Sequence, residues 1–310
     1  MLKNKGPILV IGENGQLANA LRVVSKKIKL FRPIIFKGSS KINLETFSID
    51  NFNIIFEEIN PALVINTGAY TNVEGAENDK NLAMKINAEG VGKLAKACSK
   101  RKINLFHVST DYVFNGKSKN PYRTLDLPDP LNNYGKSKLA GEKLLSPKEL
   151  NYFLIRVSWI FSIYGKNFVK TMINLAMQND EIKVVSDQVG GPTSANSIAS
   201  IILNLIEPAI NNYHPNSKFE KTFPWGTYHY QGEPCISWYE YALEIFQQAY
   251  DLGILEKIPR VIPIKSSESK SNALRPKNSK LDCSKLEKQF GLKRPPWKKE
   301  LKNVLTELWK

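Results

Sequence analysis

The sequence has little of what metal or disulfide chemistry needs. Its 310 residues include 3 cysteines and 3 histidines. The thiols of Cys98, Cys235 and Cys283 lie far apart in the chain, and neither they nor the histidines follow a metal-ligand motif. We therefore expect neither a disulfide framework nor a zinc site, and we interpret the cysteines as packing residues. A structural metal of another kind stays open.

Long apolar runs are also missing. No stretch approaches the about 20 consecutive apolar residues that cross a bilayer, and Met1 to Pro7 lacks the apolar core of a signal peptide. We expect a cytoplasmic protein with no membrane partner. The apolar fraction of 42% and the charged fraction of 24% are those of an ordinary globular protein, and the length suits one large α/β unit or two joined units.

Acidic residues are scarce relative to basic ones. Asp and Glu number 29 against 44 Lys and Arg, a formal net charge of +15. Such an excess attracts nucleic acid when it is clustered. Here the lysines are spread along the chain, and the densest run, Lys293 to Lys302, is interrupted by prolines and Trp297. We expect solvated lysines and no nucleic-acid partner, although a basic surface would attract an anionic, diphosphate-bearing ligand.

Short apolar runs alternate with helical patterns in the first half of the chain. The predicted strands are 7–11, 34–36, 63–66, 105–108 and 153–157. The predicted helices are 17–25, 78–101 and 134–145. This alternation predicts an α/β fold built on a doubly wound parallel sheet of the Rossmann type, in which ligands bind at the carboxyl ends of the strands.

Beyond Trp159 the alternation loosens. Further helices are predicted at 168–177, 197–206, 238–250 and 298–309, and further strands at 183–185 and 261–264. We interpret 1–157 as a dinucleotide-binding domain, completed by part of 181–206. Residues 158–310 then form mainly a smaller C-terminal substrate-binding α/β module. The aromatic-rich stretch 211–226 is not assigned to any element.

A glycine-rich turn joins the first strand to the first helix. Gly12 permits the tight turn, and Gly15 lets backbone N–H groups approach a pyrophosphate at the helix N-terminus. The turn therefore predicts a dinucleotide cofactor. The candidate cofactor-binding residues in this turn and in the turn after the third strand are Gly12, Asn14, Gly15, Gln16, Leu17, Thr67, Gly68 and Ala69.

The residues after the second strand bear on the choice between NADH and NADPH. An acidic residue there would accept a hydrogen bond from the ribose 2′-hydroxyl and would disfavour a 2′-phosphate. This chain has Lys37, Ser39 and Ser40 in that stretch, and no carboxylate from position 37 to position 41. A cation with hydroxyls suits a phosphate, so we expect NADPH, with NADH the less favoured donor.

Tyr134 and Lys138 are four residues apart on a predicted helix and so share one face. We expect the Lys138 ammonium to lower the pKa of the Tyr134 phenol from about 10 toward neutrality, which would make the phenol a proton donor. Thr110, at the end of a predicted strand, can hydrogen-bond a carbonyl under reduction. The spacing alone is also that of a surface pair, but its place after a dinucleotide turn and a strand-end hydroxyl favours catalysis.

These residues resemble the catalytic set of the extended short-chain dehydrogenase/reductases, and most closely the dTDP-4-dehydrorhamnose reductases among them. The similarity runs from the glycine turn to beyond position 275. The stretches that carry it are GENGQL (12–17), VINTGAYTNVEGAE (64–77), STDYVF (109–114), PLNNYGKSKLAGE (130–142), RVSW (156–159), DQVGGPT (187–193) and RPKNS (275–279).

The resemblance implies a reaction. NADPH would reduce the C4 ketone of dTDP-4-dehydro-L-rhamnose to dTDP-L-rhamnose, a nucleotide sugar used in cell-surface polysaccharide. It implies that Tyr134 supplies the proton and that Lys138 also binds the nicotinamide ribose. By the same resemblance, the residues that line the sugar pocket are Val73, Tyr112 and Trp159.

Two other functions stay open. A nucleotide-sugar epimerase of the same family would hold NAD tightly and return the hydride. A non-catalytic regulatory subunit, similar to that of methionine adenosyltransferase, would keep the fold without the chemistry, although the intact Thr110, Tyr134 and Lys138 argue against it. A dehydratase needs a second carboxylate after Asp111, where this chain has Tyr112. The nucleotide, the sugar epimer and the oligomeric state are undecided, and a homodimer is open.

Overall fold

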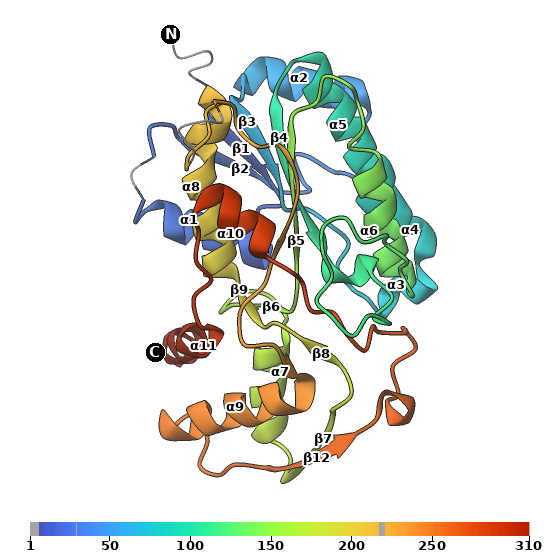
Figure 1. Cartoon of the computed structure of the whole chain (residues 1–310), viewed down its shortest axis with the longest axis vertical. Coiled ribbons are helices and arrows are strands. Elements are labelled where there is room, and N and C mark those ends of the chain that lie inside the picture. Colours follow the sequence, from blue (N-terminus) through green and yellow to red (C-terminus); the bar gives the residue numbers. More distant parts are fainter. Residues whose placement is uncertain (1–5, 29, 217–220, 310) are drawn as a thin grey trace.

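The structure, a computed structural model, describes residues 6–28, 30–216 and 221–309. Its largest sheet has six parallel strands in the order β10-β5-β4-β3-β1-β2 (Figure 1). The strands are β1 (Ile8–Ile11), β2 (Ile34–Lys37), β3 (Leu63–Asn66), β4 (Asn104–Thr110), β5 (Tyr152–Val157) and β10 (Gly226–Tyr230). The strand order reverses at β1, which is the topological switch point of a doubly wound sheet. The predicted fold class is confirmed.

Helices cover both faces of this sheet (Figure 1). Those on one face are α1 (Gln16–Ser25), α8 (Ala195–Asn211) and α10 (Ser284–Phe290). Those on the other are α2 (Ile49–Ile59), α5 (Val91–Lys100) and α6 (Asn133–Lys143). Because successive residues of a strand point to opposite faces, Ile8 and Val10 pack against the first layer, and Leu9 and Ile11 against the second.

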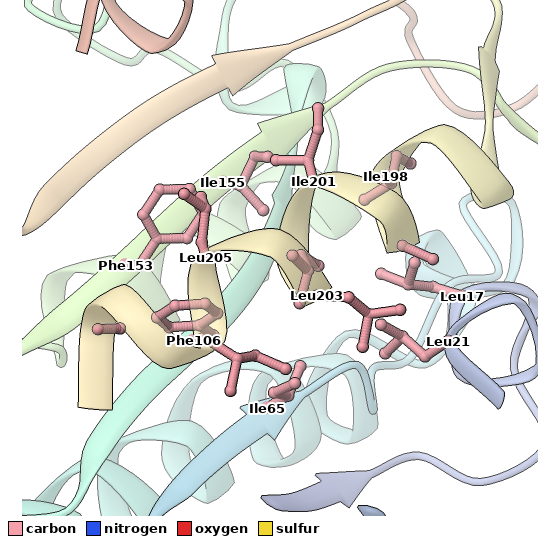
Figure 2. Packing of buried hydrophobic residues seen from close by; sticks show 14 of the residues in the cluster. Leu17, Leu21, Ile65, Phe106, Phe153, Ile155, Ile198, Ile201, Leu203 and Leu205 are labelled. Carbon is pink, nitrogen blue, oxygen red and sulfur yellow. The ribbon is translucent and has the colours of Figure 1, made fainter. Parts of the chain in front are cut away.

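The core between α8 and the sheet is continuous with α1. Figure 2 shows Ile201 and Leu205 of α8 beside Ile155 and Phe153 of β5. Leu17 of α1 belongs to the same cluster and is buried. The helix that opens at the glycine turn is thus held in place by residues from the second half of the chain.

The helix predicted over 78–101 is not uniform. The chain forms α3 (Gly75–Asn78), α4 (Lys80–Met84), a π-helical segment η1 (Lys85–Gly90) and then α5. In a π-helix each N–H bonds to the carbonyl five residues earlier, one residue further than in an α-helix. Such segments are often found near functional sites. A Cβ on Gly90 would lie only 2.1 Å from the Leu44 carbonyl oxygen, so glycine permits the close packing of this segment.

The sixth strand, β10, comes from a region where the sequence predicts no strand. It pairs with β5, with Tyr228 opposite Ile155. Just before it, Phe223 of the unassigned aromatic stretch packs on Phe106 and Phe153. Residues 217–220 of that stretch lie outside the described residues. The part described around Phe223 belongs to the core of the large sheet and not to the substrate module.

The smaller module lies below the large sheet in Figure 1. Its helices are α7 (Phe168–Ala176), α9 (Trp238–Asp251) and α11 (Trp297–Leu308), and its strands β7 (Glu181–Val185) and β12 (Arg260–Ile264) run parallel. The remaining short elements are η2 (Asp111–Val113), β6 (Ile160–Phe161), β8 (Val189–Gly190), β9 (Thr193–Ser194), β11 (Ile236–Ser237) and η3 (Ser266–Glu268). The module has its own apolar core, centred on Ile245, Leu301 and the fully buried Trp297.

The described part of the chain has neither a membrane-spanning helix nor a metal-binding cluster. None of its helices is long and apolar enough to cross a bilayer. Across residues 6–28, 30–216 and 221–309, no cluster of three or more His, Cys, Asp or Glu side chains is placed to hold a metal ion. Cys98, Cys235 and Cys283 are free thiols, and the first and last are buried.

Candidate active site

A cavity of about 1100 Å³ lies between the carboxyl ends of the large sheet and the smaller module. It runs past the turns that follow β1, β2, β3, β4 and β5, as expected at the switch point of this fold. The predicted site residues that line it are Gly12, Asn14, Gly15, Gln16, Leu17, Ser39, Thr67, Gly68, Ala69, Val73, Thr110, Tyr112, Tyr134, Lys138 and Trp159. Lys37 and Ser40 are not among its lining residues.

The glycine turn forms one end of this cavity. Gly12 has φ +101°, a region that favours glycine, and a Cβ there would lie 2.6 Å from the Gly68 backbone nitrogen. A Cβ on Gly15 would meet only the Gly12 oxygen, at 3.9 Å, so the space in front of the α1 N-terminus is open. A backbone cradle of this shape fits a diphosphate.

Gln16 is predicted to bind the cofactor, but its side chain is hydrogen-bonded to residues of the protein. Its Oε1 accepts hydrogen bonds from Ser162 Oγ at 2.9 Å and from Asn167 Nδ2 at 3.0 Å. Asn167 is also the N-cap of α7, where its side chain accepts the Lys170 N–H. The Gln16 side chain therefore ties the glycine turn to the first helix of the smaller module.

The end of β2 is next to a carboxylate that comes from another part of the chain. The absence of a carboxylate at 37–41 suggested a site for a phosphate, but the fold brings Glu13 there from the glycine turn. Its Oε2 accepts a hydrogen bond from the Gly38 N–H at 3.1 Å, directly after the last residue of β2. Glu13 lines the cavity, whereas Lys37 does not. The lack of a carboxylate at positions 37 to 41 therefore does not leave the end of β2 without one.

Thr110 and Asp111 lie at the end of β4, and both are buried. Thr110 caps the short helix η2, since its Oγ1 accepts the Tyr112 N–H at 3.2 Å, and it donates to Asp111 Oδ1 at 2.9 Å. Burial raises the pKa of Asp111 to about 7, against hydrogen bonds from Thr110 and Ser279 that lower it. A carboxyl group of this kind changes charge close to neutral pH.

Tyr134 and Lys138 lie on α6, which begins after the N-cap Asn132. Lys138 Nζ donates to the Val108 carbonyl oxygen at 2.8 Å, and burial lowers the pKa of Lys138 to about 8. For Tyr134 the main effect is also desolvation, which raises the pKa of the phenol above 10; a hydrogen bond with Thr110 acts in the opposite direction. The expected lowering of this pKa by Lys138 is thus wrong for this structure, and the phenol keeps its proton at neutral pH.

Aromatic and charged side chains form the other end of the cavity. Trp159, with φ +45°, stacks on Trp238 of α9, with ring centroids 3.4 Å apart and planes 9° apart. Tyr112 packs edge-on against Tyr134, with centroids 5.9 Å apart. Arg275, which also lines the cavity, forms a hydrogen bond with Tyr112 and an ion pair with Glu74 at 3.0 Å. A stacked indole and a cation suit a sugar ring and a phosphate.

Taken together, the residues fit a nicotinamide dinucleotide. The glycine turn offers backbone donors at one end, and Tyr134, Thr110 and Lys138 lie at the other, where the nicotinamide of a dinucleotide bound across the switch point would lie. Room beyond Tyr134, toward Trp159 and Trp238, is left for a second ligand within the same cavity.

Known proteins identify the family. Residues 6–309 match a family model described as the RmlD substrate binding domain. The dTDP-4-dehydrorhamnose reductase of Aggregatibacter actinomycetemcomitans is 38% identical over 306 residues, which cover 96% of this chain and 97% of the relative. The chain belongs to the dTDP-4-dehydrorhamnose reductase family.

Solved structures of the dTDP-4-dehydrorhamnose reductase family share this fold. The structure from Clostridium acetobutylicum superimposes with a TM-score of 0.84 at 35% identity, covering 98% of this chain and 100% of that one. The structure from Bacillus anthracis, described as a complex with NADP, has a TM-score of 0.83 at 32% identity and covers 98% and 99%. The membership predicted from the motifs is confirmed, and NAD(P) is the cofactor of the family.

Several residues that line the cavity of this dTDP-4-dehydrorhamnose reductase family member were not predicted as site residues from the sequence. Asp111 lies in the stretch STDYVF and Arg275 in the stretch RPKNS, so the sequence indicated their place in the site only through these family motifs. Trp238 follows Ser237 in a capping box, a pattern that predicts only a helix start. Nothing local marks Glu13 as a neighbour of the second strand, because the contact with Gly38 spans 25 positions.

Proposed function

We propose that this protein is a dTDP-4-dehydrorhamnose reductase that transfers a hydride from NADPH to the C4 ketone of dTDP-4-dehydro-L-rhamnose. The product is dTDP-L-rhamnose, and one proton is taken up with the hydride. The observation that carries this proposal is the convergence of Thr110, Tyr134 and Lys138 in the same cavity as the glycine turn. Family membership over residues 6–309 supports it.

In this mechanism Tyr134 gives its phenolic proton to the oxygen at C4. Desolvation keeps that proton in place at neutral pH, so the group is ready as an acid. Thr110 Oγ1 lies at the end of β4, where it donates to Asp111 Oδ1, and its hydroxyl would turn from Asp111 to hold the same oxygen by a hydrogen bond. Lys138 has its ammonium fixed by the Val108 carbonyl, and from there it would bind the nicotinamide ribose.

The cofactor, when bound, supplies the hydride. We assign its diphosphate to the glycine turn and its adenosine end to the residues after β2, with NADPH preferred. The assigned residues are Gly12, Asn14, Gly15, Gln16, Leu17, Lys37, Ser39, Ser40, Thr67, Gly68, Ala69, Tyr134 and Lys138. Support is strongest for the turn, where the open space beside Gly15 fits a diphosphate. It is weakest for Lys37 and Ser40, which do not line the cavity.

The nucleotide sugar occupies the part of the cavity toward the smaller module. Val73, Tyr112 and Trp159 line it there, and Trp159 offers an indole face supported from behind by Trp238. We place the reaction in the cytoplasm, since free thiols such as the buried Cys98 and Cys283 are typical of a reducing compartment.

The proposal is tested by following NADPH oxidation at 340 nm, the absorbance of the reduced nicotinamide, with dTDP-4-dehydro-L-rhamnose as acceptor. Tyr134→Phe should lower kcat by roughly 100-fold or more, since positioned proton transfer contributes about 10²–10⁴. Tyr152→Phe, at the start of β5 and outside the cavity lining, is the matched control and should turn over like the wild type.

Three outcomes would contradict this function. Turnover that survives Tyr134→Phe unchanged would remove the proposed acid. Tightly bound NAD that copurifies with the protein, with epimerised sugar as product, would indicate an epimerase. Absence of any turnover together with stable binding to a methionine adenosyltransferase would indicate a regulatory subunit.

A further inference from the structure

We infer that the Glu13 carboxylate is a specificity-determining group for the cofactor, and that it acts against the 2′-phosphate of NADPH and in favour of the 2′-hydroxyl of NADH. The inference rests on the proposed function in one respect, that the cavity holds a nicotinamide dinucleotide. The residues after β2, taken alone, would favour NADPH over NADH. The inference is that Glu13 reduces this preference.

The position of Glu13 carries the inference. In a doubly wound fold the adenine ribose lies beside the end of the second strand, where an acidic residue can accept a hydrogen bond from its 2′-hydroxyl. Such a residue ordinarily stands in the sequence after that strand. Here Glu13 reaches the same place from the turn after β1, with its Oε2 3.1 Å from the Gly38 nitrogen.

Gly38 is part of this arrangement. A Cβ at that position would lie 3.0 Å from Glu13 Oε2 and 3.3 Å from the Glu13 Cβ, so a side chain there would push the glutamate away. Gly38 and Glu13 line the cavity next to Ser39. A carboxylate accepts several hydrogen bonds, so the Gly38 N–H leaves acceptor capacity for a ribose hydroxyl.

Arg22 is paired with Glu13 and offsets part of the charge of its carboxylate. Arg22 Nη2 lies 3.8 Å from Glu13 Oε1, and its guanidinium also lies over the Phe36 ring, 4.3 Å from the centroid. Asn19 accepts a further hydrogen bond from Arg22 at 2.8 Å. These contacts hold Arg22 toward Glu13 and Phe36, while the neighbouring Lys37 does not line the cavity. Because both side chains of the Glu13–Arg22 pair are partly exposed, at 41% and 36%, Arg22 offsets only part of the Glu13 charge.

The test measures cofactor binding separately from turnover. The dissociation constants of NADP⁺ and NAD⁺ are determined by calorimetry for the wild type and for Glu13→Gln. Glutamine keeps an oxygen for the Gly38 N–H but removes the charge, so the ratio of the two constants should shift toward NADP⁺ by about tenfold. Glu58→Gln, the same charge change at an exposed position on α2 outside the cavity lining, should leave the ratio unchanged.

The salt dependence of the binding ratio distinguishes electrostatic repulsion by Glu13 from a steric effect of its side chain. A repulsion between partly exposed charges is screened, so the shift in Glu13→Gln should be larger at about 50 mM than at about 500 mM salt. A ratio in Glu13→Gln within twofold of the wild type, or a shift that salt does not change, would overturn the inference. Failure of the proposed function reads differently: the sugar nucleotide would then cause no NADPH oxidation, whatever the binding ratio.

Discussion

Asp111 and Lys138 are buried ionisable groups on neighbouring elements of the cavity, and their pKa values lie close to neutrality. Burial brings the pKa of Asp111 up to about 7 and the pKa of Lys138 down to about 8. Groups displaced in this way cluster at functional sites. They also make the stability of the folded chain depend on pH, because each loses solvation when it becomes charged in the interior.

Asp111→Asn tests this dependence. The folded pKa of Asp111 is raised from 3.8 to about 7, so its contribution is most favourable at low pH and is lost as pH rises through about 7. Between pH 5 and pH 8 the wild type should lose about 2–3 kcal/mol of unfolding free energy through this group. Asparagine does not ionise, so urea unfolding should show the variant gaining that amount over the wild type as pH rises.

Buried histidines also make the stability depend on pH, and the comparison between variant and wild type separates the contribution of Asp111 from theirs. Burial lowers the pKa of His107 and of His229, which favours the folded state above their ordinary pKa and costs stability as pH falls. Both proteins share that effect. A difference in unfolding free energy that is the same at pH 5 and at pH 8 would contradict the assignment to Asp111.

The helices α9 and α2 both begin with a serine capping box, but only the first residue of α9 lines the cavity. Ser237 caps α9 in a capping box with Glu240, and Ser48 caps α2 in one with Asn51. Only α9 carries a cavity residue directly after its cap, the Trp238 that supports Trp159.

Ser237→Ala and Ser48→Ala should therefore share one effect and differ in another. Loss of a capping side chain costs about 1 kcal/mol, so both should unfold in urea at lower denaturant concentration. Ser237→Ala should also raise the KM for the sugar nucleotide severalfold, because Trp238 loses its fixed backbone, while Ser48→Ala should not. Equal KM values in the two variants would show that the α9 cap does not position the aromatic pair.

The elements predicted from sequence are those with a clear local pattern. The first five strands and the helices that follow the glycine turn and Tyr134 have apolar runs or caps that need no partner to be recognised. The helix α2 was missed although its Ser48 box marks its start. The strand β10 is short and aromatic, and only pairing with β5 makes it a strand. In the same way Thr110 and Tyr134 were found from motifs, but Glu13 and Trp238 became visible only in the fold.

Over the whole molecule, the first 157 residues do not contain all of the large sheet. Its outer strand β10 and its covering helices α8 and α10 come from later in the chain, and they supply residues such as Ile202, Tyr228 and Phe290 to one core. Burial of apolar side chains is the main stabilising contribution, and this core would be largely uncovered without them.

A fragment of residues 1–157 should therefore fail to fold on its own. We expect it to aggregate or to show no cooperative thermal transition by circular dichroism, whereas the full chain should show one. A fragment extended to residue 292 regains β10, α8 and α10 and is the matched comparison. A cooperative transition in the 1–157 fragment would show that the early strands form an independent domain.

The position of β10 also has a consequence for the protein as it leaves the ribosome. At about 5–20 residues per second, several seconds pass while the roughly 70 residues between Val157 and Gly226 are added. During that interval the nascent chain exposes the unpaired edge of β5 and an uncovered apolar face, both of which favour association with other chains. Synthesis of this protein should thus depend on chaperones that hold nascent chains, and slower translation of residues 158–225 should lower its soluble yield.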